Sequence, residues 1–322
     1  MDDSPLLSAP EAPLDPHERD RWLQARADQL DDVIAAELRR IIGISVDEFI
    51  AGLAPDSPEA LTAAADFTVF DAILPRWEQA VRANILPFVG EYYLSGALNA
   101  AIVAPGFAAV APDVAARWAA VVNTQAQEWA LSRTPVLLDV APAVRADIAG
   151  KVASAIQSGL STEGVAAQVQ ELIGASEYRA SVIARTEVQA AYENGNYEAA
   201  DALDEFKPVE KIWLATLDDR TREAHMEMNN VVVAWDDDFN VPANERGDDA
   251  AMMRAPMDMS APLSQWIQCR CVHQELYVGM QRPDGSIVGT DSLSDYQQAM
   301  EDPNADQVFA PQWERARIAP TQ

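Results

Sequence analysis

The feature that most constrains the fold is a long helical pattern that stops at a proline. Apolar residues recur at helical spacing from Ser176 to Leu203, and Lys207-Pro208 ends the pattern because proline has no backbone N–H and clashes with the preceding turn. Upstream, the same spacing predicts further helices, at residues 17–42, 88–103, 112–132, 142–158 and 161–174. We therefore expect the chain to be helical over most of its length up to residue 203.

Beyond the proline, short β patterns replace the helical spacing. Residues 209–217 have a strand-like pattern, residues 231–235 are rich in β-branched side chains and predict a second strand, and residues 269–278 predict a third. A single helical turn is expected at residues 264–267. The predicted fold class is therefore mainly α, with a helical N-terminal body followed by a small α+β domain.

These patterns divide the chain into four parts. Residues 1–16 are proline-rich and predict a flexible arm, and residues 17–158 predict a helical N-terminal domain. Residues 159–280 combine helices with the small α+β unit in a second domain. Residues 281–322 are mostly polar and predict a tail, which opens with a turn at Pro283-Asp284-Gly285.

The acidic composition narrows the range of partners. The chain has 51 acidic and 23 basic residues and a net charge of -28. Such a surface repels nucleic acid and anionic lipid, so we expect no sequence-specific nucleic-acid binding and a protein partner with basic faces instead. The uncharged run at residues 95–112 is interrupted by Pro105-Gly106, which disfavours a membrane span. We see no signal peptide and expect synthesis in the cytoplasm of the cell that expresses the chain.

The chain has two cysteines, and they form a C-x-C pair at Cys269 and Cys271. Residues two apart on a strand point to the same side, so both sulfurs are expected on one face. Two thiolates and one imidazole are typical zinc ligands, and we predict His225 as the imidazole and Asp219 as the fourth ligand. His273 shares the face of the cysteines but lies further along the strand. Packed core thiols and a covalent or redox role remain open beside the zinc site.

A second candidate cluster lies on the long helix and beyond it. Glu187 and Asn194 are seven residues apart and therefore share a helical face, with Arg185 and Thr186 beside them. These side chains predict a buried polar network between the long helix and the α+β unit, to which Asp219 and Arg222 would also belong. An ordinary solvated helix face is the alternative interpretation. Downstream, Asp218, Asp219 or Thr221 is expected to cap the short helix that carries His225.

Three motifs occur in an order that resembles a known family. They are Ala-Arg-Thr-Glu-Val at residues 184–188 with Asn194, Trp-x-Ala-x-x-Asp-Asp-Arg-Thr-Arg-x-x-His at 213–225, and Pro-Leu-Ser-Gln-x-Ile-x-Cys-Arg-Cys at 262–271. Together they resemble the phage Mu F-like minor head proteins, also called MuF or head morphogenesis proteins, over roughly residues 161–278. Two positions depart from the family pattern. Met228-Asn229-Asn230 stands where family members usually have Asp-Gly, and Gln268 stands where they usually have Asn.

The resemblance implies a structural protein of the virion, not an enzyme. It implies a minor capsid protein at the portal vertex of the phage head, with the portal protein and the major capsid or scaffold protein as partners. The expected role is in head assembly, genome packaging or genome delivery. Two alternatives are a MuF-type toxin or enzyme that uses Arg185, Glu187 and His225, and a membrane-active ejection protein that uses the apolar run at residues 97–110.

Overall fold

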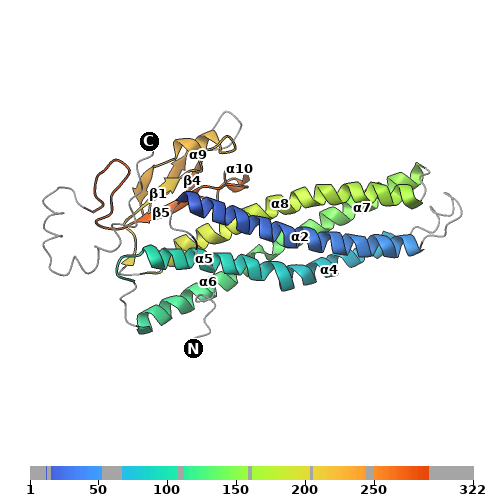
Figure 1. Cartoon of the computed structure of the whole chain (residues 1–322), viewed down its shortest axis with the longest axis horizontal. Coiled ribbons are helices and arrows are strands. Elements are labelled where there is room, and N and C mark those ends of the chain that lie inside the picture. The colour runs from blue at the N-terminus through green and yellow to red at the C-terminus, as the bar shows by residue number, and fades with distance from the viewer. Residues whose placement is uncertain are drawn as a thin grey trace. The chain divides into compact units, whose positions relative to one another are not determined.

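The computed structural model describes residues 12, 16–52, 67–107, 112–158, 162–203, 206–243 and 250–289. The predicted arm, apart from Ala12 and Pro16, and the predicted tail beyond Gly289 lie outside these residues. Up to Asp201 the described segments are helical, as the sequence predicts (Figure 1). These helices are α2 (Pro16–Gly52), the 3-10 helix η1 (Phe67–Ala72), α4 (Ile73–Ala80), the π-helical η2 (Val81–Ile85), α5 (Leu86–Val103), α6 (Pro112–Leu138), α7 (Val140–Gln157) and α8 (Thr162–Asp201).

The predicted helix end near Gly174 is wrong. Helix α8 runs without a break from Thr162 to Asp201 and takes in both stretches that the sequence analysis separated at this glycine. A glycine inside a helix costs only about 1 kcal/mol relative to alanine. Gly174 is not followed by a proline, so the flanking helical sequence carries the helix through it.

The chain divides into two compact units. Unit 1 comprises Met1–Leu23, Gly90–Gln127 and Gln189–Gln322, and unit 2 comprises Gln24–Val89 and Glu128–Val188. Each unit therefore consists of segments that lie far apart in the sequence.

Unit 2 is a helical bundle. Its core contains apolar side chains of α2 and α4, including the fully buried Leu30, Ile34 and Trp77. The indole of Trp77 donates a hydrogen bond of 2.7 Å to the carbonyl of Leu137, which joins α4 to α6. Arg76 of α4 forms two hydrogen bonds with Glu48 of α2. Apolar packing and a few polar links between helices thus hold this unit together.

Unit 1 contains the strands. An antiparallel sheet of order β2-β1-β5 consists of β1 (Glu210–Leu214), β2 (Val232–Ala234) and β5 (Val272–Leu276), with the short helices α9 (Glu223–Glu227) and α10 (Leu263–Trp266) in the connections (Figure 1). All three strands fall inside the predicted ranges. A two-stranded sheet of β3 (Phe239–Val241) and β4 (Ala251–Met253) was not predicted, because three-residue strands carry too little alternation to be recognised.

The two faces of the larger sheet differ in chemistry. In the β1–β5 register Lys211 pairs with Glu275 and Trp213 with His273, so these four buried side chains share one face. The opposite face carries an apolar cluster of Ile212, Leu276 and Val288. Val288 reaches it because the chain turns back at Gly285, as predicted, with a hydrogen bond of 2.8 Å from the amide of Arg282 to the carbonyl of Ser286.

Helix α8 packs against α5 at two glycines. A Cβ on Gly195 would lie 2.0 Å from the carbonyl oxygen of Tyr93, and a Cβ on Gly96 would lie 2.0 Å from that of Tyr192. Both neighbouring atoms belong to the backbone, so no side-chain movement relieves such a clash. Gly195, which interrupts the apolar stripe in the sequence, is therefore the residue that lets the two helices approach closely.

Candidate functional site

Three side chains of unit 1 that the sequence analysis singled out lie together. The ligand atoms of His225, Cys269 and Cys271 are all within 4.8 Å of one another, and all three residues are at most 2% exposed. His225 Nδ1 is 3.4 Å from the Sγ of Cys269 and 3.6 Å from the Sγ of Cys271. Asp219, the predicted fourth ligand, is exposed and does not belong to this group of described residues.

The cysteines meet because of a turn, not because of strand alternation. Strand β5 begins at Val272, so the predicted strand start at Cys269 is wrong. Gln268 adopts a left-handed backbone with φ of 53°, and the amide of Cys269 donates a 3.0 Å hydrogen bond to the carbonyl of Trp266. Asparagine adopts this conformation more readily than glutamine. The usual asparagine of the family at this position therefore fits the same turn.

A second left-handed residue lies after the histidine. Asn230 has φ of 68°, and its amide donates a hydrogen bond of 2.8 Å to the carbonyl of Trp213. The side chain of Asn229 accepts a 3.0 Å hydrogen bond from the amide of Ala215. Asn230 thus provides the turn where the family usually has Asp-Gly, because asparagine tolerates the positive φ that glycine adopts freely.

The hydrogen bonds around His225 orient its ring. Nε2 lies 3.0 Å from the side-chain oxygen of Gln265, a fully buried residue of α10. The indole of Trp213 packs edge-on against the imidazole, with ring centroids 5.2 Å apart. With the amide oxygen of Gln265 as acceptor, the neutral imidazole carries its proton on Nε2, and Nδ1 then presents its lone pair beside the two sulfurs.

The environment shifts the pKa values of the two thiols in opposite directions. The hydrogen bond with Cys271, and next to it the hydrogen bond and charge of His225, lower the pKa of Cys269 well below its ordinary value. The hydrogen bond with Cys269 and burial raise the pKa of Cys271 well above that value. Burial opposes protonation of His225, but the neighbouring Cys269 outweighs it and raises the pKa of the imidazole. Cys269 is thus the first thiol to ionise, facing the histidine.

Asp218, not Asp219, anchors the loop before the short helix. The Arg270 guanidinium forms an ion pair with the Asp218 carboxylate and holds the pKa of that carboxyl well below its ordinary value. The expected cap by Asp218, Asp219 or Thr221 is wrong, since Arg222 is the N-cap residue of α9 and no side chain caps the helix. Arg222 instead donates a hydrogen bond of 2.5 Å to the carbonyl of Ile267, beside the cysteine turn.

The other predicted network residues divide between the two units. In unit 2, Glu187 is 2% exposed and accepts hydrogen bonds of 2.8 and 2.9 Å from the guanidinium of Arg133. The charge of Arg185 favours the ionised form of Asp31, although burial leaves the pKa of Asp31 raised. Thr186 donates to the carbonyl of Val182.

In unit 1, Asn194 accepts a hydrogen bond of 2.6 Å from Arg254, at the end of β4. This bond links the long helix to the α+β part. Glu187, which was expected in the same network, pairs with Arg133 of α6 inside unit 2.

A cluster of buried charged side chains in unit 1 was not predicted. Glu193 of α8 accepts hydrogen bonds from the backbone amide of His273 at 3.0 Å and lies 2.7 Å from its Nδ1. The Nε2 atom of the His273 ring is 3.6 Å from the Oε1 atom of Glu275 and 3.4 Å from the Nδ2 atom of Asn196. Glu193, His273 and Glu275 are all at most 1% exposed. His273 therefore belongs to a carboxylate cluster and not to the cysteine site.

Lys211 lies beside this cluster in an aromatic cage. The side chain is fully buried, and its Nζ is 4.9 Å from the ring of Tyr197, 5.6 Å from that of Trp235 and 5.7 Å from that of Phe239. Burial lowers the pKa of Lys211 to about 8. The sequence signal for this site was the two-residue spacing of Lys211 and Trp213 in the strand Glu-Lys-Ile-Trp-Leu, which places both side chains on one face.

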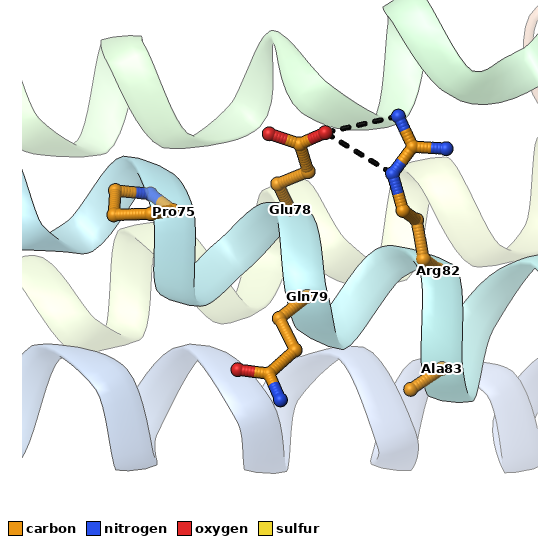
Figure 2. Close-up of a pocket in the computed structure, with 5 residues that line it drawn as sticks. All are labelled: Pro75, Glu78, Gln79, Arg82 and Ala83. Atoms are coloured by element: carbon orange, nitrogen blue, oxygen red, sulfur yellow. Dashed lines mark hydrogen bonds and ion pairs between the residues drawn. The ribbon is translucent and has the colours of Figure 1, made fainter.

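A surface depression in unit 2 is a weaker candidate for a functional site than the buried clusters of unit 1. Figure 2 shows its lining residues, Pro75, Glu78, Gln79, Arg82 and Ala83, on a single stretch of α4 and η2. Arg82 donates hydrogen bonds of 3.1 and 2.9 Å to Glu78 within this stretch. The depression is open and its ion pair is exposed, so the buried clusters of unit 1 are the stronger candidates for a functional role.

The described helices also bear on membrane interaction. None of them combines the length and the apolar composition that a bilayer span needs. Ala97 and Ala100, within the run considered for membrane activity, are buried in unit 1.

Comparison with known proteins identifies the class. Residues 146–274 match the family described as Phage Mu protein F like protein. This segment of the chain is therefore phage Mu F-like, which confirms the resemblance seen in the three motifs, and the family is one of phage head morphogenesis. The matched segment includes the whole of α8, the first four strands and most of β5.

One curated relative has a different description. The chain is 30% identical over 137 residues to an NAD(+)--arginine ADP-ribosyltransferase EFV of Enterococcus faecalis. The alignment covers 42% of this chain but only 26% of the relative, so the chain spans about a quarter of that protein's length. The comparison with solved structures gave no match.

Proposed function

We propose that this protein is a minor capsid protein that acts at the portal vertex in head assembly and in genome packaging or delivery. The observation that carries the proposal is the family match over residues 146–274, which falls on the segment with the most buried polar side chains. In this segment Glu187, Glu193 and His273 each face another protein group inside the fold. Such inward-facing charges support a structural role, because a substrate could not reach them without opening the fold.

The charge of the chain supports a protein partner. With a net charge of -28, the protein is repelled by packaged DNA and attracted to basic faces of a portal, major capsid or scaffold protein. Electrostatic attraction of this kind mainly accelerates association and weakens as salt screens it. The proposed location is therefore the virion head, at a contact with protein and not with DNA.

Quantitative mass spectrometry of purified particles tests this proposal. Particles of the phage that encodes the chain should contain it at a low, reproducible ratio to the major capsid protein. Procapsids isolated before packaging should contain it at the same ratio. Absence from both particles and procapsids would overturn the proposal. Size-exclusion chromatography with purified portal protein, at low and at high salt, then tests the partner, and the complex should weaken as salt rises.

An enzyme or toxin remains the second candidate because of the ADP-ribosyltransferase relative. That protein's activity belongs to a chain of which three quarters lies outside the alignment. Here, Glu187 is engaged by Arg133, and both Glu187 and His225 are nearly fully buried. We therefore expect incubation with NAD⁺ and an arginine acceptor to release no nicotinamide above the blank. A rate that falls in Glu187→Gln, with an unchanged melting temperature, would favour the enzyme.

A further inference from the structure

We propose that His225, Cys269 and Cys271 bind one zinc ion, which fastens α9 to the turn that leads into β5. The proposal is independent of the proposed function and rests on the geometry of the three side chains. They converge from two segments more than forty residues apart in the sequence.

The separations of the ligand atoms fit a tetrahedral ion. Zn–S bonds of about 2.3 Å and Zn–N bonds of about 2.0–2.1 Å, at tetrahedral angles, place nitrogen and sulfur about 3.6 Å apart. The observed separations from His225 Nδ1 are 3.4 Å to Cys269 and 3.6 Å to Cys271. An ion therefore fits between the three atoms with little movement of the side chains.

The position of Gln265 favours the tautomer that a metal requires. In the neutral imidazole, the amide oxygen of Gln265 accepts from Nε2, which leaves the lone pair on Nδ1, the nitrogen nearest both sulfurs. A buried acceptor on the far nitrogen is the usual arrangement of a metal-bound histidine, because it fixes the ring and raises the basicity of the ligating atom. Gln265 is itself fully buried, so this orientation does not depend on solvent.

Charge balance favours zinc at this depth. Two thiolates and a neutral imidazole around Zn²⁺ make a set without net charge. The same thiolates without the ion would be costly to bury. Sulfur and imidazole ligands select zinc over the oxygen-preferring Mg²⁺ and Ca²⁺. Because the three residues are at most 2% exposed, a substrate could not reach the ion without opening the fold. The ion is therefore structural.

Metal titration of the full chain tests the site. The protein is reduced, stripped with chelator and titrated anaerobically with Co²⁺, a spectroscopic substitute for Zn²⁺. We expect one equivalent to produce thiolate-to-cobalt charge-transfer absorption and the visible bands of a tetrahedral ion, and Zn²⁺ to abolish both. Zn²⁺ should also raise the melting temperature by roughly 5 °C at saturating concentration.

Single variants assign the ligands. Cys269→Ser and Cys271→Ser should each reduce the charge-transfer absorption, and His225→Gln should weaken Co²⁺ binding by about tenfold or more. Asp219→Asn is the matched control, because Asp219 is an exposed acid close to His225 in sequence and outside the cluster. It should leave the spectrum and the affinity unchanged.

Three results would overturn the proposal, and the first two are measured on the wild-type chain, so they remain available even where a variant fails to fold. Two free thiols without a cobalt spectrum would identify plain packed cysteines. A thiol count of zero in the unreduced, denatured chain would identify a disulfide. Zinc stabilisation that persists in all three ligand variants would show binding elsewhere, for instance to surface acids.

Discussion

The two buried histidines of unit 1 have opposite surroundings. His225 faces two sulfurs and has an amide oxygen behind it, whereas His273 lies between the carboxylates of Glu193 and Glu275. The first set of side chains is suited to binding a soft metal ion, and the second holds the imidazole by hydrogen bonding and charge inside the fold. The same small domain thus contains a thiol–histidine centre, which we expect to respond to metal, and a carboxylate–histidine centre, which we expect to contribute to stability alone. Helix α8 supports both, since Gln189 donates a 3.1 Å hydrogen bond to the carbonyl of Cys271 and Glu193 accepts from His273.

The largest expected effect comes from removing the support that both centres share. In Gly195→Ala the new methyl group would lie 2.0 Å from the backbone oxygen of Tyr93, so α8 and α5 must separate. We expect a loss of about 4 kcal/mol or more in the free energy of unfolding, measured by urea titration. Gly150→Ala is the control, because no atom lies within 4 Å of its new methyl group, and it should stabilise by roughly 0.5–1 kcal/mol. Equal effects of the two variants would contradict the close approach.

The next effect falls on the carboxylate–histidine centre alone. Glu193→Ala leaves the amide and the ring of His273 without their buried acceptor. The expected loss is about 3 kcal/mol in the same urea titration. Glu193→Gln keeps an acceptor oxygen and should lose only about 1 kcal/mol. Equal losses of stability in the two variants would show that the hydrogen bonds of Glu193 are unimportant. As a control, the cobalt spectrum of both variants should match that of the wild type.

The buried Lys211, beside the carboxylate–histidine centre, makes stability depend on pH. Because the folded state lowers the pKa of Lys211 from 10.5 to about 8, the unfolded chain binds more protons between these values, and the stability contributed by this residue rises with pH across that window. In Lys211→Met the rise should disappear, and the variant should be roughly 1–2 kcal/mol more stable than the wild type at pH 7. Urea titrations of both proteins from pH 7 to pH 10 measure the difference, and parallel curves would contradict the prediction.

The smallest effect concerns the residue behind His225. Gln265→Ala removes the acceptor of Nε2 and should cost about 1 kcal/mol in the metal-free protein. Its zinc affinity should fall about tenfold, because the imidazole is no longer held in one tautomer. Ser264→Ala, on the same short helix, removes a buried hydroxyl that has no hydrogen-bond partner among the described residues, and should change neither quantity. A matching loss of zinc affinity in both variants would point to helix α10 as a whole, not to Gln265.

Much of the architecture was predictable from local sequence. Helical spacing and Lys207-Pro208 located the change from helices to strands, and the β-branched runs located three strands, because these patterns report which side of an element is buried. The predicted helix end at Gly174 was wrong, because a helix tolerates one glycine when the sequence on both sides favours the helix.

The candidate sites were only partly predictable, because local sequence identifies some of their residues and distant contacts set the partners of the others. The scarcity of cysteine and histidine in the sequence pointed to Cys269, Cys271 and His225 as neighbours, and their motifs pointed to the phage Mu F-like family. The tertiary structure decided that Asp219 stays outside the cluster and that His273 belongs with Glu193. The reason is physical: periodicity fixes which face a side chain lies on, but not which distant segment covers that face. The partners of buried charges are set by helix and sheet packing, which joins residues about eighty positions apart.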